Sequence, residues 1–171
     1  MQELLKAVDA FPEMKFVFTK ANADVGGKEM NALIDQFVLC HANCVAFASL
    51  GIKRYLSLLQ YSDGILGNSS SGIVEAPTLG IPTINIGNRQ KGRLQADSII
   101  NCEPSKEQIV QAIEQSQTPK FKNRARHTIN PYGDGNTSEK IVQTITEYLL
   151  QDKVSWGWLR RGPRSSGAAD R

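Results

Sequence analysis

Residues 63–93 read DGILGNSSSGIVEAPTLGIPTINIGNRQKGR, and they hold two short apolar runs, each followed by a loop of small or polar residues. The runs at 63–66 and 82–86 are predicted to be buried strands. Residues 73–79 between them are predicted to be a helix that Gly80 closes. A strand, a helix and a second strand in such quick succession indicate a βαβ unit, whose two strands run parallel.

The same alternation of apolar runs continues on both sides of this unit. It predicts an α/β fold: a doubly wound parallel sheet with helices on both faces. Residues 117–129 show no such pattern and are interpreted as a polar connecting segment. The remaining strands are predicted at residues 15–19, 44–47 and 98–102, and the remaining helices at residues 2–11, 28–38, 52–60, 106–116 and 137–150.

The pattern also predicts how the chain divides. Residues 1–150 are expected to form one nucleotide-binding domain. Residues 151–171 lack periodicity, are rich in Gly, Ser and Arg, and are expected to be a disordered basic tail. The alternative is that Trp156 and Trp158 help this tail to bind a membrane surface or a protein partner.

Composition narrows the function classes. The 171 residues carry 20 basic and 17 acidic side chains, a net charge of +3, which is too small to indicate nucleic-acid binding. Neither a signal peptide nor an apolar run of the ~20 residues that cross a bilayer is present, so a cytoplasmic protein without membrane contact is expected. The spacing of the three cysteines, Cys40, Cys44 and Cys102, is typical neither of a disulfide framework nor of a metal site. The segment from Cys40 to Cys44 is interpreted as the end of a helix followed by a buried strand.

The loop Gly67–Gly72 (GNSSSG) is the strongest candidate for a binding site. Small residues allow backbone N–H groups to approach a ligand, hydroxyl groups add donors, and the following helix adds positive charge at its N-terminus. Ser69, Ser70, Ser71 and Gly72 are therefore candidate phosphate-binding residues. The alternative is an ordinary serine-rich turn that caps a helix.

Two charged side chains stand close to this loop. Glu75 follows it inside the predicted helix, where a carboxylate could accept hydrogen bonds from the vicinal hydroxyls of a ribose. The alternative is that the helix dipole favours an acidic residue near the N-terminus. Arg89, in the loop after the next strand, could clamp a phosphate, or it could belong to an ordinary solvated loop together with Lys91 and Arg93.

Taken together, the motifs resemble the hydrolysing UDP-N-acetylglucosamine 2-epimerase family over about residues 1–150. The resemblance implies one Rossmann-like half of a two-domain glycosyltransferase-B-type fold, with the active site between the domains and the N-terminal domain absent here. The segments that carry it are NAD at 22–24, GGKEM at 26–30, YLSLL at 55–59, GNSSSGIVEAP at 67–77, IPTINIG at 81–87, RQKGR at 89–93 and YGDGN at 132–136.

The resemblance also implies roles for individual residues. Ser69 and Ser70 would hold the diphosphate, Glu75 would hold the ribose hydroxyls, and Arg89 would lie near the phosphates or the sugar. Residues 22–24, including Asn22 and Asp24, would lie beside the uracil or the cleft. Relatives that release UDP-N-acetylmannosamine tend to have an aspartate at the position of Asn68, so the asparagine favours the hydrolysing branch.

The reaction implied is conversion of UDP-N-acetylglucosamine to N-acetylmannosamine and UDP, for sialic acid-type sugars, without a cofactor or metal. The family takes its catalytic carboxylates and histidine from segments that match nothing here, and neither His41 nor His127 falls at the histidine's place. We therefore name no catalytic residue and expect the chain alone to be inactive. The missing domain and a second copy are expected partners. A glycosyltransferase of the same fold and a non-catalytic nucleotide-sugar-binding remnant are the alternatives.

Overall fold

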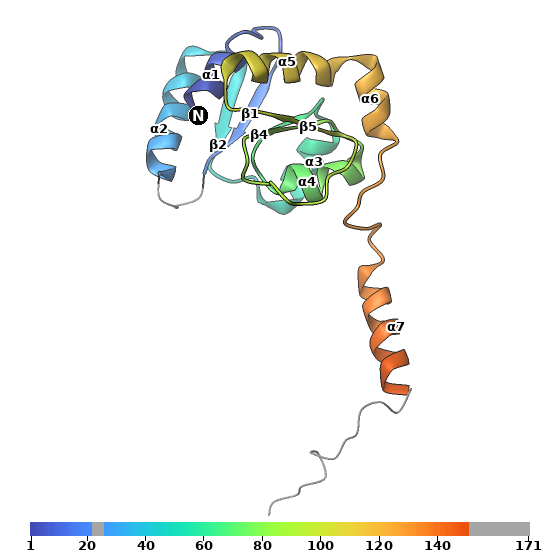
Figure 1. Ribbon diagram of the computed structural model, residues 1–171. Helices are drawn as coiled ribbons and strands as arrows, with labels where there is room; N and C mark the ends of the chain where they lie inside the picture. Colours follow the sequence, from blue (N-terminus) through green and yellow to red (C-terminus); the bar gives the residue numbers. More distant parts are fainter. Residues whose placement is uncertain (22–25, 151–171) are drawn as a thin grey trace, which may run out of the picture. The chain divides into compact units, whose positions relative to one another are not determined.

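The computed structural model describes residues 1–21 and 26–150, which fall into two compact units (Figure 1). The first unit is Met1–Tyr132, and the second begins at Gly133. The described part of the second unit contains helix α7 (Thr137–Leu150), as predicted. The prediction of a single domain over 1–150 stays a prediction, and the predicted tail at 151–171 lies outside the described residues.

The first unit alternates helices and strands in the predicted order, and the five predicted strands are present to within two residues at each end. The elements are α1 (Gln2–Val8), β1 (Phe16–Thr19), α2 (Gly27–Cys40), β2 (Cys44–Phe47), α3 (Gly51–Gln60), β3 (Ile65–Gly67), α4 (Ser71–Val74), the 3₁₀ helix η1 (Ala76–Leu79), β4 (Thr83–Ile86), β5 (Ile99–Cys102), α5 (Lys106–Gln117) and α6 (Pro119–Arg126).

All strand pairs in these elements are parallel, which confirms the predicted α/β class. β1 pairs with β2, and β3, β4 and β5 form a three-stranded sheet in that order. Leu66 lies opposite Ile84, and Ile84 lies opposite Ile100. Consecutive strands are thus neighbours, so the loops after β3 and β4 leave the sheet side by side at its carboxyl edge.

The three-stranded sheet has helices on both faces (Figure 1). On one face, buried apolar side chains of the strands pack against α1, α5 and α6; this cluster consists of Ala7, Ile84, Ile100, Cys102, Ile109, Ala112, Ile113, Phe121 and Ala125. On the other face α4 lies against β4, where the Thr83 hydroxyl donates to the Gly72 carbonyl at 2.9 Å. Packing thus fixes the sheet on one face, and on the other face it holds the end of the loop Gly67–Gly72, called the serine loop below.

The β1–β2 pair is covered less completely than the three-stranded sheet. Helix α2 packs on one face, where the rings of Phe18 and Phe37 meet edge to face with centroids 6.3 Å apart. On the other face Val17, Val45 and Phe47 remain 40%, 46% and 44% exposed. As predicted, Cys40 ends α2 and Cys44 is buried at the start of β2. Cys40 is exposed, and both thiols are free.

Two predicted features were wrong. The helix expected at 73–79 is interrupted: α4 is a single turn, and Ala76–Leu79 form a 3₁₀ helix that Gly80 ends with a φ of 66°. Pro77 lacks a backbone N–H, so it begins a new turn and does not continue α4. Residues 117–129, predicted to be a connecting segment, contain α6.

None of the helices in the described segments has the length and apolar character that crossing a membrane requires.

Candidate functional site

A hydrogen bond joins the loop after β3 to the loop after β4. The Gln90 side chain donates from Nε2 to the Asn68 carbonyl at 2.7 Å, across 22 residues of sequence. Gln90 is only 3% exposed. Because Ser69 follows Asn68 and Arg89 precedes Gln90, this bond brings the predicted phosphate-binding serines and the predicted phosphate-binding arginine into one neighbourhood.

Ser69 and Ser70 form the open part of the serine loop. Both are exposed, and their carbonyls accept from Gly72 N–H at 3.3 Å and Val74 N–H at 2.9 Å. Their own N–H groups have no acceptor among the described residues, whereas the Ser71 N–H donates to Ser69 Oγ at 3.3 Å. Two neighbouring backbone donors and two hydroxyls are therefore available to an anion, as in the concave backbone sites that bind phosphate.

Ser71 and Gly72 are instead packed into the protein. The Tyr55 hydroxyl, from α3, donates to Ser71 Oγ at 2.7 Å, and burial raises the pKa of Tyr55. Gly72 is buried against Thr83. Of the four candidate residues, Ser69 and Ser70 are thus open to a ligand. Ser71 and Gly72 instead anchor the loop to α3 and β4.

Glu75 lies at the junction of α4 and η1, and its side chain caps neither helix. Its Oε2 atom is buried and has no hydrogen-bond donor among the described residues. Glu75 is both the C-cap of the four-residue α4 and the N-cap of η1, so the two helix dipoles act on its carboxylate in opposite directions and do not explain its presence by themselves. A buried acceptor without a donor is costly, so a ligand hydroxyl would relieve that cost.

Arg89 is exposed, as are Lys91 and Arg93, and none of the three forms an ion pair with a carboxylate in the described part of the chain. A guanidinium without a carboxylate partner is free to bind a phosphate through two parallel N–H···O hydrogen bonds, the bidentate geometry that arginine favours. Asn22 and Asp24 fall outside the described residues.

Sequence reasoning named neither Gln90 nor Asn130 as site residues. Asn130 donates to the Val74 carbonyl at 2.8 Å and to Thr78 Oγ1 at 2.6 Å, so it ties the chain after α6 to the back of α4 and η1. In the sequence, the position of Gln90 between the cations Arg89 and Lys91 is the feature that could have marked it as a site residue. Its partner, a backbone carbonyl in another loop, has no signature in sequence.

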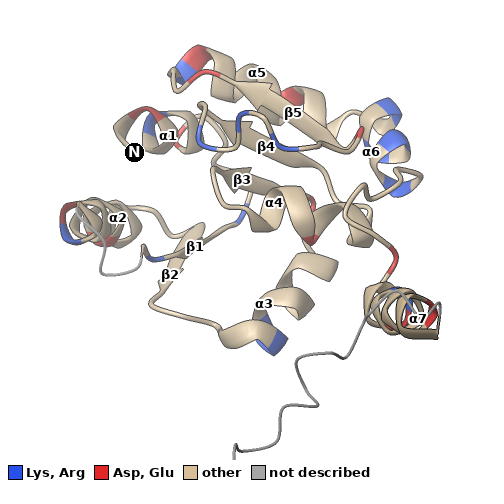
Figure 2. Cartoon of the chain, turned by 60° about the horizontal axis from the view of Figure 1, so that its bottom comes forward, with Lys and Arg blue, Asp and Glu red and all other residues tan. Residues whose placement is uncertain are grey.

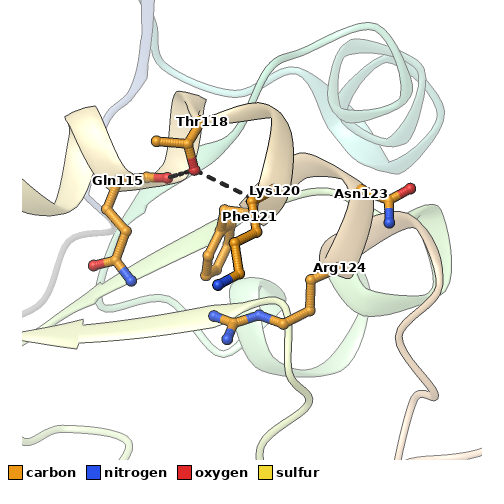
Figure 3. Close-up of a pocket in the computed structure, with 6 residues that line it drawn as sticks. All are labelled: Gln115, Thr118, Lys120, Phe121, Asn123 and Arg124. Atoms are coloured by element: carbon orange, nitrogen blue, oxygen red, sulfur yellow. Dashed lines mark hydrogen bonds between the residues drawn. The ribbon is translucent and has the colours of Figure 1, made fainter.

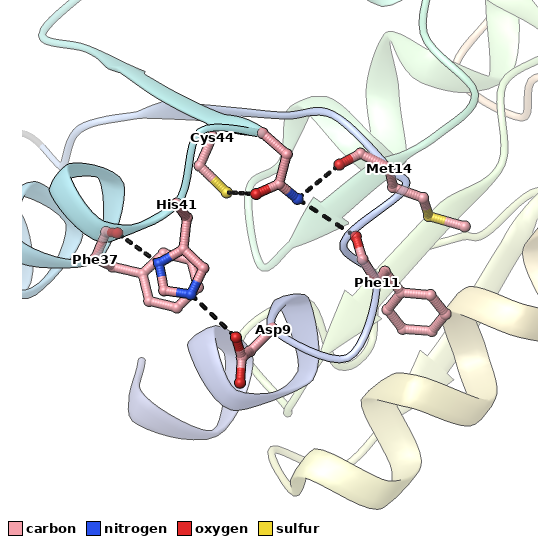
Figure 4. A network of polar contacts seen from close by, with 7 residues as sticks. Asp9, Phe11, Met14, Phe37, His41 and Cys44 are labelled. Atoms are coloured by element: carbon pink, nitrogen blue, oxygen red, sulfur yellow. Dashed lines mark hydrogen bonds and ion pairs between the residues drawn. The ribbon is translucent and has the colours of Figure 1, made fainter.

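His41 contacts Phe37 of α2 and Asp9, which follows α1, and these contacts belong to the packing of the first unit (Figure 4). Its ring stacks on Phe37 at 3.7 Å, Nδ1 lies 2.7 Å from the Phe37 carbonyl, and Nε2 lies 3.0 Å from Asp9. His127 ends α6, exposed, with Nδ1 2.9 Å from the Asn123 carbonyl. Both histidines thus have structural partners.

A separate hollow lies at the junction of α5 and α6 (Figure 3), and several Lys and Arg residues lie along α6 (Figure 2). The Arg124 guanidinium lies over the Phe121 ring at 4.4 Å. None of the predicted site residues that the structure describes lines this hollow, and none of its lining residues has a buried side-chain N or O atom that lacks a partner within 1–21 and 26–150. Its lining residues are Gln115, Thr118, Lys120, Phe121, Asn123 and Arg124.

Comparison with known proteins gives a consistent result. Residues 1–146 match the sequence model of the family described as UDP-N-acetylglucosamine 2-epimerase. GDP/UDP-N,N'-diacetylbacillosamine 2-epimerase (hydrolyzing) from Campylobacter jejuni is 37% identical over 157 residues, which cover 90% of this chain and 40% of that protein. Polysialic acid biosynthesis protein P7 from Escherichia coli is 36% identical over 151 residues, 87% of this chain and 38% of that protein.

Solved structures share the fold. The S. aureus MnaA–UDP co-structure has a TM-score of 0.73 at 22% identity, covering 87% of this chain and 42% of that chain. UDP-GlcNAc 2-epimerase from Neisseria meningitidis bound to UDP-GlcNAc has a TM-score of 0.66 at 21% identity. The match covers 85% of this chain and 40% of that chain. The chain thus spans about 40% of the length of the curated relatives it matches.

Proposed function

Because the chain belongs to the UDP-N-acetylglucosamine 2-epimerase family, we propose that its first unit is the UDP-binding half of a UDP-sugar epimerase. The observation that carries the proposal is the pair of N–H groups at Ser69 and Ser70, which have no acceptor among the described residues, together with Arg89, which forms no ion pair there. These groups would bind the diphosphate. Glu75 would accept hydrogen bonds from the ribose hydroxyls through its buried Oε2, which has no donor in the described part of the chain.

The direct test is a calorimetric titration of UDP into the full chain. A half-site is expected to bind with a Kd of about 0.1–1 mM, or ~4–5.5 kcal/mol. Ser70→Ala and Glu75→Ala should each weaken binding, because each removes a group that contacts UDP. Ser57→Ala and Glu114→Ala, the same changes at exposed positions outside the site, should not. Equal affinities for all five proteins would refute the assignment.

The reaction we propose is the hydrolysing one, with release of UDP and the free 2-epimerised sugar. The name of the Campylobacter jejuni relative supports hydrolysis. UDP-N-acetylglucosamine is the proposed substrate, and N-acetylmannosamine the proposed product, for sialic acid-type sugars. UDP-N,N'-diacetylbacillosamine is a second candidate, because relatives from Campylobacter jejuni and Legionella pneumophila are named for it.

We further propose that the chain by itself binds UDP without turning over either sugar nucleotide. Proton transfer at the sugar requires a positioned acid and base. In the described residues, His41 pairs with Asp9 and His127 lies at the end of α6, so neither serves the serine loop. Chromatography of the chain incubated with each substrate should show no release of UDP. Release of UDP with free sugar would contradict this proposal and still support hydrolysis.

A further inference from the structure

Gln90 is buried in a loop whose other residues are exposed. From Asn88 to Gln95 every residue except Gln90 is exposed, and the cations at 89, 91 and 93 face solvent. A glutamine is rarely buried, because both ends of its amide then need partners. Here one end has a partner, the Asn68 carbonyl, and the other, Oε1, has none among the described residues.

The bond to Asn68 determines the direction of the next N–H group. No peptide bond in the described segments is cis, and in a trans peptide the C=O and the following N–H point to opposite sides. Because Gln90 holds the Asn68 carbonyl toward itself, the Ser69 N–H points away from Gln90. That N–H is one of the two donors left without an acceptor in the serine loop.

Other contacts hold the residues on either side of this peptide: Gly67 pairs with Asn85 at the end of β3, and Ser69 accepts from the N–H groups of Ser71 and Gly72. Gly67, the preceding residue, has a φ of 145°, a conformation from which a glycine can rotate at low cost. Asn68 is exposed and lies outside any helix or strand. Among the described residues, the Gln90 side chain is the hydrogen-bond partner of the peptide group between Asn68 and Ser69 itself, so it acts directly on the plane of that peptide.

We propose that Gln90 is a positioning residue for diphosphate binding: it orients the Ser69 N–H toward the phosphates and keeps Arg89 beside the serine loop. This role rests on the function proposed above. The proposed role needs no contact between Gln90 and the ligand, because the side chain is only 3% exposed and acts through its bond to the Asn68 carbonyl. A site whose donors are oriented before binding loses less conformational entropy when the anion arrives.

Gln90→Met tests the proposal, because methionine keeps the length and buried volume of the side chain and removes only the amide. The folded state should tolerate the change, since it also removes a buried acceptor that has no donor among the described residues, and since the carbonyl that loses its donor belongs to an exposed residue. Full-length wild type and variant are titrated by NMR with UDP and with uridine, and a thermal melt confirms that each is folded. If the variant does not fold, Gln90→Leu replaces it.

The expected result is a UDP Kd raised about threefold to tenfold with the uridine Kd unchanged, the loss of about one hydrogen bond's contribution. Gln95→Met is the matched control, because Gln95 bonds Asn101 and not the serine loop, and it should bind UDP as wild type does. An unchanged UDP Kd, or equal losses for UDP and uridine, would overturn the positioning role alone. A wild type that binds no UDP would overturn the proposed function, and this inference with it.

Discussion

At Gly72 the serine loop passes so close to β4 that a methyl group cannot be added without a clash. A Cβ there would lie 2.6 Å from the Cγ2 of Thr83. The Thr83 hydroxyl also donates to the Gly72 carbonyl at 2.9 Å, so the serine loop and β4 cannot move apart without losing that bond. We expect Gly72→Ala to reduce the free energy of unfolding by about 1–3 kcal/mol, as overpacking does in other cores. Urea denaturation measures the change.

The same contact supplies a control. Thr83→Ser removes the Cγ2 that the new methyl would meet and keeps the hydroxyl that bonds Gly72. Gly72→Ala should therefore cost less in the Thr83→Ser background than in wild type, and the double-mutant cycle gives the coupling between the two positions. Strict additivity would mean that the clash is not the cause of the destabilisation.

His41 gives a pH-dependent contribution to stability. The Phe37 carbonyl, and after it the Asp9 carboxylate, raise the pKa of His41. Both partners are acceptors, so only the doubly protonated ring can donate to both at once. A pKa that is higher in the folded than in the unfolded state gives stability that is fully present below the unfolded value of about 6.5 and is lost as the pH rises through the folded value.

The measurement is the urea midpoint of unfolding at pH 5.5 and at pH 8.5. Wild type should lose stability between these two values by more than His41→Gln does, because glutamine cannot titrate. The carboxylates with lowered pKa, Glu3 and Asp134, lose their contribution on acidification below this range and do not interfere. An identical pH dependence in both proteins would exclude His41 as its source.

At the residue scale, the sequence predicted which residues belong to the candidate site. It did not predict which of them are open to a ligand and which are packed against the rest of the protein. Ser69 to Gly72 look alike as a row of small residues. Contacts with side chains distant in sequence distinguish these residues from one another. The Tyr55 hydroxyl donates to Ser71 Oγ, and Thr83 packs against Gly72 and bonds its carbonyl. Hydrogen bonds between distant segments leave no periodicity, so no pattern within the loop could reveal them.

At the scale of elements, Thr118 both ends α5 and begins α6 (Figure 3). Its hydroxyl donates to the Gln115 carbonyl at 2.8 Å and accepts from the Phe121 N–H at 3.3 Å. Thr118→Ala should therefore cost about 1 kcal/mol of stability, the usual effect of losing an N-cap, whereas Thr118→Ser should retain both bonds and most of the stability. Urea denaturation of the two variants compares them, and equal losses would assign the effect to the lost methyl group.

The elements that sequence predicted well are the ones with strong periodicity. The five strands and α2, α5 and α7 follow from apolar runs or an apolar stripe. α6 was missed because only Phe121 and Ala125 of its eight residues are buried, too few for a stripe. Its Thr-Pro start, an N-cap followed by proline at the first helical position, was the available signal.

At the scale of the whole molecule, the described site residues all lie in the first unit. The serine loop, Glu75, Gln90 and Arg89 precede Tyr132, and so does every member of the main core cluster. Asn130 and Tyr132 close the unit, since Asn130 bonds Val74 and Thr78 and the Tyr132 hydroxyl donates to the Leu94 carbonyl at 3.1 Å. UDP binding should thus depend on residues up to 132 alone.

A chain that ends after Tyr132 should accordingly unfold in one cooperative transition and bind UDP with a Kd within about twofold of the full chain, a difference below ~0.5 kcal/mol. A chain that ends after Ala125 is the matched comparison. It loses the bonds of Asn130 to the back of α4 and η1, so it should bind UDP more weakly. If ending the chain after Tyr132 itself abolishes binding, then α7 or the residues beyond it contribute to the nucleotide site, and the domain extends to 150, as the sequence pattern predicts.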